Sequence, residues 1–375
     1  SEMCIRDRAT GVAIGDFDAD GDNDVAVVNN GENNVSIFIN AGGGAFAAQA
    51  TVGAGMMPEQ ITAGDLNADG SADLVVSNTG SMNVTVLLAN GMGGFAGANV
   101  TVGNDPGGIA IADMDGDGDN DVLVTNTMDN TLSLLANDGL GALAAPVNTA
   151  TGTSPEDVAV ADFDADGDVD VAVASSGSGD VQIFTNDGTG ALNQTDNEAA
   201  ASPTAIEAGD FDNDGDIDLI VAGGGTQTIT SLINVDALGD MVLGRTEMTG
   251  ASADDIVVAD FNGDALPDFA VGQGATFGNT SIEAFLNNAI DPQDITFLVS
   301  LFGETTNTVT VDFATSDGLA LAGMGEDYIA ASGTLTFPPG TVSQLITVTT
   351  NSDLIAEPAE DFNVTLSNPV NAIIA

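Results

Sequence analysis

Short apolar runs and acidic turns alternate along residues 9–288 of the chain. In each unit a short apolar run, such as 12–15, precedes a nine-residue acidic segment, and a second apolar run follows, such as 25–28. A third run alternates apolar and polar residues, as in 35–39, and a weaker fourth run follows a glycine-rich turn, as in 42–46. These runs predict four strands per unit, and no segment has the period of a helix. Because the first and second runs are nearly continuous in small and β-branched residues, we expect both to be buried on both faces.

The acidic segments recur at intervals of 48 to 50 residues, which indicates an array of like structural units. They begin at Asp16, Asp65, Asp113, Asp162, Asp210 and Asp260. The third run of each unit ends at an asparagine: Asn40, Asn90, Asn137, Asn186, Asn234 and Asn287. Four strands in a unit of this length are typical of a β-propeller blade, whereas the alternative, a parallel β-helix, has much shorter repeats.

The pattern changes after residue 288, where segment 289–294 has the composition of a linker. From residue 295 to 375 the chain is rich in threonine and valine and lacks the acidic segment. Its strand-like runs are 295–301, 308–314, 333–337, 345–350 and 362–366. Short strands separated by turns predict a β-sandwich. The whole chain is therefore expected to be all-β, a propeller of four-stranded blades followed by a C-terminal sandwich.

Composition narrows the functions that the chain can have. Its net charge is −54, from 57 acidic residues against three arginines, and it contains no histidine. Such a surface repels nucleic acid and anionic membranes and attracts divalent cations. The lack of histidine excludes Ser-His and Cys-His nucleophiles and zinc bound by imidazole. We see no transmembrane run and no signal peptide. Residues 1–8 carry Cys4 and two of the three arginines, and they resemble translated adapter sequence. We therefore expect a non-native tail and a missing natural N-terminus.

The acidic segments have the pattern of an oxygen cage for a cation. Carboxylates stand at positions 1, 3, 5 and 9, and a glycine at position 6 lets the backbone reverse. Calcium accepts irregular cages of six to eight oxygens, so it is the expected ion rather than magnesium. A single acidic turn would be an ordinary soluble turn, but six copies in phase favour a metal site. An EF-hand would need a glutamate at position 12, which is here Val27, Val76, Val124, Val173, Val221 and Val271.

This segment, Asp-x-Asp-x-Asp-Gly-x-x-Asp between two strands, resembles the FG-GAP/VCBS repeat of integrin α-subunit propellers and bacterial surface proteins. The resemblance covers residues 9–288. It implies about six calcium ions, each bound by the side chains at positions 1, 3, 5 and 9 and by the carbonyl at position 7. The implied ligands are Asp16, Asp18, Asp20, Asp22 and Asp24; Asp65, Asn67, Asp69, Ser71 and Asp73; Asp113, Asp115, Asp117, Asp119 and Asp121; Asp162, Asp164, Asp166, Asp168 and Asp170; Asp210, Asp212, Asp214, Asp216 and Asp218; and Asp260, Asn262, Asp264, Leu266 and Asp268.

Two of the six segments depart from this pattern. The second has Asn67 at position 3, a neutral oxygen ligand that predicts a weaker site. The sixth has Asn262 at position 3, Ala265 in place of the glycine and Pro267 at position 8, so its site is the weakest expected. Propellers of this family usually close with seven blades, so we expect one blade beyond the six visible here.

The C-terminal segment resembles the Calx-β domain. The similarity lies in 309–318, Asp327-Tyr328, 333–340 and 360–369. It implies a seven-stranded sandwich whose last strand is incomplete, and whose usual acidic first strand is not recognisable here. It also implies further calcium ligands at one end of the sandwich, namely Asp317, Asp353, Glu357 and Glu360.

These features predict a non-enzymatic function. We expect a fragment of a large secreted or surface-anchored bacterial protein, with calcium-rigidified modules that bind a protein or polysaccharide ligand at the cell surface. Nucleic acid and direct insertion into a membrane are not expected. The alternative is a non-catalytic, carbohydrate-binding accessory region of a secreted polysaccharide-degrading enzyme. The sequence shows no aromatic sugar platform, because it has no tryptophan and one tyrosine.

Overall fold

The computed structural model describes residues 9–224, 226–234, 239, 241–248, 252–263, 266–274, 281–285, 293–301, 307–317, 330–350 and 362–372. Every regular element in these segments is a β-strand, as the sequence pattern predicts. Among the same residues, no helix is long and apolar enough to span a bilayer. The all-β fold is therefore confirmed for the described part of the chain.

The repeats form antiparallel sheets whose strands follow chain order. Five sheets have four strands, and the sixth has three within the described residues. The acidic segment joins the first strand of each sheet to the second. The strands are β1 (Ala9–Gly15), β2 (Asp24–Asn29), β3 (Asn34–Asn40), β4 (Phe46–Gly53), β5 (Pro58–Gly64), β6 (Asp73–Asn78), β7 (Asn83–Ala89), β8 (Phe95–Thr101), β9 (Pro106–Ala112), β10 (Asp121–Asn126), β11 (Thr131–Leu135), β12 (Val147–Ala150), β13 (Pro155–Ala161), β14 (Asp170–Ser175), β15 (Asp180–Asn186), β16 (Leu192–Ala199), β17 (Pro203–Gly209), β18 (Asp218–Gly223), β19 (Thr228–Asn234), β20 (Met241–Met248), β21 (Ser252–Ala259), β22 (Asp268–Gly274) and β23 (Ser281–Phe285).

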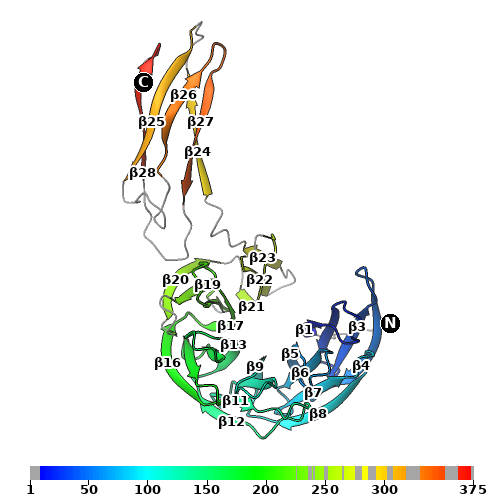
Figure 1. Ribbon diagram of the computed structural model, residues 1–375. Helices are drawn as coiled ribbons and strands as arrows, with labels where there is room; N and C mark the ends of the chain where they lie inside the picture. The colour runs from blue at the N-terminus through cyan, green and yellow to red at the C-terminus, as the bar shows by residue number, and fades with distance from the viewer. Residues whose placement is uncertain are drawn as a thin grey trace, which may run out of the picture.

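The sheets stand around a centre like the blades of a propeller (Figure 1). The first strand of each sheet lies at the centre and contacts the first strand of the next, from β1 and β5 through to β17 and β21. The fourth strands lie at the outside. The arc is open, because the sheet of β1 and the sheet of β21 face each other across a gap (Figure 1). The propeller architecture predicted from the repeat length is thus confirmed as an open arc.

The hydrophobic core lies between successive sheets. The second strands of repeats two to five (β6, β10, β14 and β18) are buried at every residue, as expected for strands covered on both faces. β2 instead alternates buried and half-buried residues, because its sheet has a neighbour on one face only. Our expectation was wrong for the first strands, since Val12 and Ile14 on β1 are 59% and 62% exposed. These strands line the centre, where they are covered only in part.

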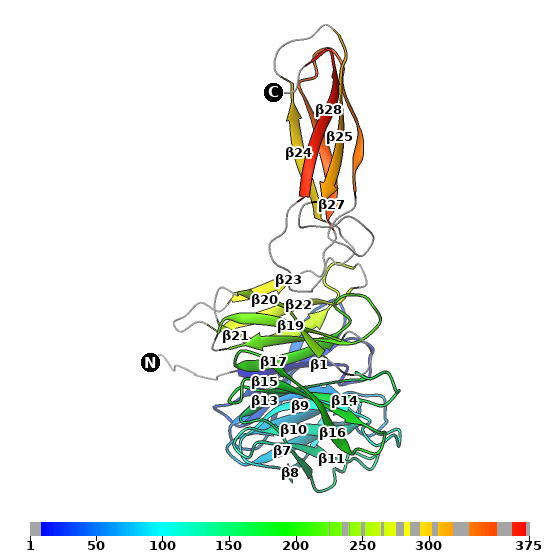
Figure 2. The same cartoon turned by 90° about the vertical axis from the view of Figure 1, so that its left-hand side faces the viewer.

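The C-terminal strands form a small sandwich of two sheets. One sheet pairs β24 (Gln293–Ser300) with β27 (Ser343–Thr350), and the other has the order β26 (Ser332–Phe337), β25 (Val309–Asp317) and β28 (Phe362–Val370). Val311 and Phe337 from one sheet pack with Ile346 and Val348 from the other. The five strands occupy the runs that the sequence predicts. The sandwich projects beyond the sixth repeat, away from the rest of the arc (Figure 2).

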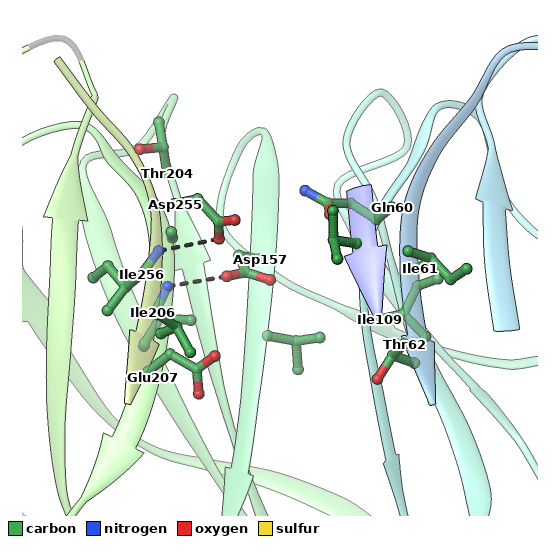
Figure 3. A pocket seen from close by; sticks show the side chains of 15 residues that line it. Gln60, Ile61, Thr62, Ile109, Asp157, Thr204, Ile206, Glu207, Asp255 and Ile256 are labelled. Carbon is green, nitrogen blue, oxygen red and sulfur yellow. Dashed lines mark hydrogen bonds between the residues drawn. The ribbon is translucent and has the colours of Figure 1, made fainter. Parts of the chain in front are cut away.

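A polar pocket of about 260 Å³ lies among the first strands at the centre of the arc. Asp157 on β13, Glu207 on β17 and Asp255 on β21 project into it, and Gln60 on β5 faces them (Figure 3). Oδ2 of Asp157 accepts a hydrogen bond from the backbone N–H of Ile206 at 3.0 Å. Burial raises the pKa of Asp157 to about 7, and the nearby charges of Asp255 and Glu156 add to this rise. Burial likewise raises the pKa of Glu207 to about 7.

We expect the substitution Asp157→Asn to raise the melting temperature at pH 8, measured by calorimetry with excess chelator. The folded-state pKa of about 7 lies above the usual value of 3.8, so the folded protein binds this proton more tightly than the unfolded chain does. The charge therefore destabilises the fold fully above pH 7, and the penalty fades as pH falls toward 4. At pH 4 the wild type and the variant should melt together.

Asp129→Asn is the matched control, because the pKa of Asp129 is lowered whereas that of Asp157 is raised. The Asp129 carboxylate accepts hydrogen bonds of 2.7 Å from both the side chain and the backbone N–H of Asn104, which lower its pKa. This variant should lose stability above pH 4 and match the wild type in acid. If Asp157→Asn melts at or below the temperature of the wild type at pH 8, the ionised Asp157 does not destabilise the fold and the prediction is wrong.

Candidate metal centres

The backbone of each acidic loop reverses at position 6. This residue is glycine in the first five loops, with φ between 86° and 102°. A Cβ added at any of these glycines would contact nothing, so the requirement for glycine is conformational rather than steric. The glycine N–H donates to Oδ2 of the position 1 aspartate at 2.9–3.2 Å: Gly21 to Asp16, Gly70 to Asp65, Gly118 to Asp113, Gly167 to Asp162 and Gly215 to Asp210. The loop thus folds back over its first carboxylate.

The loops bring the carboxylates of positions 1, 3 and 9 together. In four of them, one oxygen from each of these aspartates lies within 4.8 Å of the other two. The groups are Asp16, Asp18 and Asp24; Asp113, Asp115 and Asp121; Asp162, Asp164 and Asp170; and Asp210, Asp212 and Asp218. Like charges at this spacing repel strongly unless a cation or a proton compensates them. Each group can therefore hold a metal ion.

Two carboxylate oxygens in these groups indicate that a cation fits there. Oδ1 of Asp18 and Oδ1 of Asp162 are shielded from solvent and accept no hydrogen bond. Buried polar atoms are otherwise nearly always paired, so these two atoms fit the role of metal ligands. Burial, followed by the neighbouring charges of Asp20 and Asp24, raises the pKa of Asp18. Burial and the Asp214 charge raise the pKa of Asp212 to about 6. An all-oxygen donor set of this kind suits calcium.

Other predicted ligands are not gathered in the same way. The aspartates at position 5 of the first five loops are exposed, and Oδ1 of each accepts the N–H of position 7, as Asp117 does from Asp119 at 3.0 Å. Their direct ligation, like that of the position 7 carbonyls, stays a prediction. In the second loop Asn67 leaves fewer than three clustered acids. In the sixth, Asp264 and Ala265 lie outside the described residues.

The predicted C-terminal ligands are mostly beyond what the structure describes. Asp353, Glu357 and Glu360 lie outside the described residues. Asp317 is the last residue of β25, and its side chain is likewise not described. Calcium binding by the sandwich therefore stays a prediction.

The EF-hand alternative is excluded for the described loops. In these repeats the acidic loop leads into a strand and not into a helix. The valines at position 12 lie inside that strand, and Val76, Val124 and Val173 are fully buried. A carboxylate at this position would point into the core between two sheets and not toward an ion.

The aspartate at position 9, which we call the closing aspartate, also supports the backbone around the loop. It is buried in all six loops, and in the first five both of its oxygens accept backbone N–H groups. In the third loop, Oδ2 of Asp121 accepts from Met114 at 3.1 Å, and Oδ1 accepts from Asn137 at 2.8 Å. Burial raises the pKa of the equivalent Asp170 to about 6 and that of Asp218 to about 7. The closing aspartate therefore ties together the loop, the second strand and the end of the third strand.

In repeats three to five, the asparagine that follows the third strand or ends it links one loop to another, a role that sequence reasoning missed. Nδ2 of Asn137 donates to the carbonyl of Leu66, in the loop of the preceding repeat, at 2.7 Å. It also donates to the carbonyl of Asn120, in the loop of its own repeat, at 2.9 Å. Asn186 and Asn234 make equivalent pairs of bonds. The recurrence of this asparagine was visible in the sequence, but its partner in another repeat was not.

Two family models match the chain. The FG-GAP-like repeat matches four times, at residues 16–76, 65–124, 113–173 and 162–221. These matches cover the first five acidic loops and leave out the sixth, which departs most from the pattern. The Calx-beta domain matches residues 291–373.

Curated relatives and solved structures agree with these models. Over 66 residues the chain is 48% identical to sodium/calcium exchanger 1 of Canis lupus familiaris and of Bos taurus, a match that covers 18% of this chain and 7% of each exchanger. A solved protein from Lactobacillus plantarum aligns with a TM-score of 0.56 at 17% identity, over 74% of this chain and 80% of that chain. BBS1N, solved in complex with ARL6DN, aligns with a TM-score of 0.54 at 12% identity, over 74% and 79% of the two chains. These structural likenesses show the fold alone.

The geometry and the comparisons lead to the same assignment. The repeat matches run from residue 16 to residue 221, which is more than half of the 375 residues. The matched units include the four whose loops gather three carboxylates. The chain therefore belongs to the FG-GAP-like repeat family, and a Calx-beta domain follows its repeats.

Proposed function

We propose that this chain is a calcium-binding extracellular interaction module of a larger secreted or surface protein. The observation that carries the proposal is the set of four groups of three carboxylates, two of which contain a buried oxygen without a hydrogen bond. Calcium in these loops neutralises the clustered charge and fixes the rim of the arc on which the loops lie. A rigid rim holds the blades in place for binding.

The partner meets the opposite rim in this proposal. The acidic loops join first to second strands, so the turns between second and third strands lie at the other end of each sheet. Met82 and Met128 in these turns are 48% and 73% exposed, and Met56 and Met57 next to them are more than half exposed. Exposed methionines adapt to differently shaped apolar partners. These side chains support adhesion to a protein, and we assign the described residues no catalytic role.

The chemistry of the sites supports the proposed location outside the cell. Partly exposed carboxylate cages on a surface of strong negative charge bind calcium at the millimolar concentrations found there, whereas cytosolic calcium is far scarcer. The FG-GAP-like and Calx-beta families fit an extracellular module of this kind. We therefore place the chain at the cell surface or in the medium.

We expect millimolar calcium to raise the melting temperature of the repeats, measured by scanning calorimetry against excess chelator. One site that binds only the folded chain adds about 2.7 kcal/mol at a hundredfold excess of ion over the dissociation constant. Four such sites should raise the melting temperature by at least roughly 10 °C. Magnesium is the control and should rescue only partly, because it demands a stricter octahedral geometry. Equal melting temperatures in chelator and in calcium refute the proposal.

Two substitutions in the third loop distinguish metal ligation from support of the backbone. Asp115→Asn removes a charge at position 3, so it should reduce the calcium-dependent rise in stability. In chelator it should raise stability slightly, because it relieves the repulsion among the three carboxylates. Asp121→Asn also replaces an acceptor of two backbone N–H groups, so it should lose about 1–3 kcal/mol even in chelator. Urea unfolding with and without calcium measures both effects. Identical profiles for the two variants contradict the assigned roles.

The second candidate is a carbohydrate-binding accessory region of a secreted polysaccharide-degrading enzyme. The observation in its favour is the central pocket, where Gln60, Thr62, Thr204 and Glu207 offer groups that hydrogen-bond sugar hydroxyls. Calorimetric titration with soluble oligosaccharides decides between the two. Saturable binding that Glu207→Gln weakens at least tenfold and Met128→Ala leaves unchanged favours this candidate. Binding that is absent, or that survives Glu207→Gln, removes it.

A further inference from the structure

Hydrogen bonds connect the acidic loops of successive repeats in series. The N–H of Leu66, at position 2 of the second loop, donates to its closing aspartate Asp73 at 2.9 Å. The carbonyl of the same residue accepts from Asn137 of the next repeat, whose backbone N–H donates to Asp121. Two closing aspartates are thus joined through only two intervening residues.

The same connection recurs twice more along the arc. From the third loop to the fourth it runs through Met114 and Asn186, with the Nδ2-to-carbonyl bond at 2.8 Å. From the fourth loop to the fifth it runs through Phe163 and Asn234, again at 2.8 Å. The three asparagines are 6%, 3% and 0% exposed, so water does not compete for these bonds. A continuous series of buried hydrogen bonds therefore joins the closing aspartates of loops two to five.

We infer that these asparagines couple the metal sites, so that an ion in one loop strengthens binding in the next. The inference rests on the proposal that the loops bind calcium. An ion held at positions 1, 3 and 9 fixes the intervening backbone, including the carbonyl at position 2. That carbonyl places the asparagine of the next repeat, and the asparagine N–H places the next closing aspartate. The second ion then binds a carboxylate that is already in position. Its binding costs less conformational entropy, because part of the loop is already ordered.

The first and second repeats lack this arrangement and show what it requires. Nδ2 of Asn40 donates to the carbonyl of Asn23 in its own loop, and the described chain has no earlier loop for it to reach. In the second repeat the asparagine stands one residue later, and Ala89 takes its place as donor to Asp73. Asn90 instead accepts the N–H groups of its own turn through Oδ1. A bridge therefore requires an asparagine at the position whose N–H donates to the closing aspartate, and a loop in the preceding repeat. Asn40 has the first but not the second within the described chain, so it serves as a control.

The bond between Asn234 and Phe163 allows the inference to be tested at one pair of loops. Asp212→Asn disables the fifth loop, and hydrogen exchange of the peptide 162–170 is followed during a calcium titration. The midpoint of calcium-dependent protection reports the affinity of the fourth loop alone. We expect Asp212→Asn to move this midpoint to about fivefold higher calcium or more. In the Asn234→Ala background the same substitution should leave the midpoint unchanged.

Asn40→Ala is the matched control, because it removes an asparagine from the same place in the sheet without cutting a bridge between loops. The shift caused by Asp212→Asn should persist in its background. A purely structural role for Asn234 would lower stability in chelator yet leave the shift intact, which is the result that overturns the inference. An unchanged midpoint after Asp212→Asn in the otherwise wild-type chain overturns it as well.

The reverse titration keeps the inference testable if Asn234→Ala does not fold. Coupling between two sites is reciprocal, so Asp164→Asn in the fourth loop must also move the midpoint of the peptide 210–218 to higher calcium. A midpoint of this peptide that stays in place while Asp212→Asn moves that of 162–170, with both loops titrating over the same calcium range, overturns the inference. Failure of the proposed function looks different, because the wild-type loops would then gain no protection from calcium at any concentration.

Discussion

In each of the first five repeats, a buried carboxylate at the start of the second strand accepts backbone N–H groups from two distant segments. One donor belongs to the acidic loop and the other to the end of the third strand, as Phe211 and Asn234 do for Asp218 at 2.8 Å each. Burial raises the pKa of Asp218 to about 7, so its charge is costly unless something compensates it. The geometry of the loop, the sheet and the metal group all depend on this one side chain.

The clustering of acids is linked to the buried charge of the closing aspartate. Nearly half of the 57 acidic residues lie in the six loops, and in four of these loops the acids at positions 1, 3 and 9 come within 4.8 Å of one another. In the proposed function, a divalent ion at the centre of each group offsets the repulsion among the carboxylates at positions 1, 3 and 9. Stability and ion binding are therefore two aspects of one arrangement, and the asparagine bridges extend this arrangement from one repeat to the next.

Features that repeat locally could be read from the sequence, and features that join different repeats could not. The strands, the glycine turn and the gathering of positions 1, 3 and 9 depend on residues within nine positions of one another. Asn186 bonds the carbonyl of Met114 across 72 residues, a contact that local spacing does not reveal. The pocket acids Asp157 and Glu207 occupy unlike places in their repeats, so they form no motif. The partial exposure of the first strands was missed because it depends on the shape of the arc.

Calcium content after dialysis tests the central claim most directly. The repeats are dialysed to equilibrium against millimolar calcium, and atomic absorption on both sides of the dialysis membrane, together with the protein concentration, gives the bound calcium per chain. The four carboxylate groups predict at least four calcium ions per chain, and replacement of Asp16, Asp113, Asp162 and Asp210 by asparagine should remove them. Fewer than one ion per chain in the unaltered protein, or equal content after those replacements, would contradict the account.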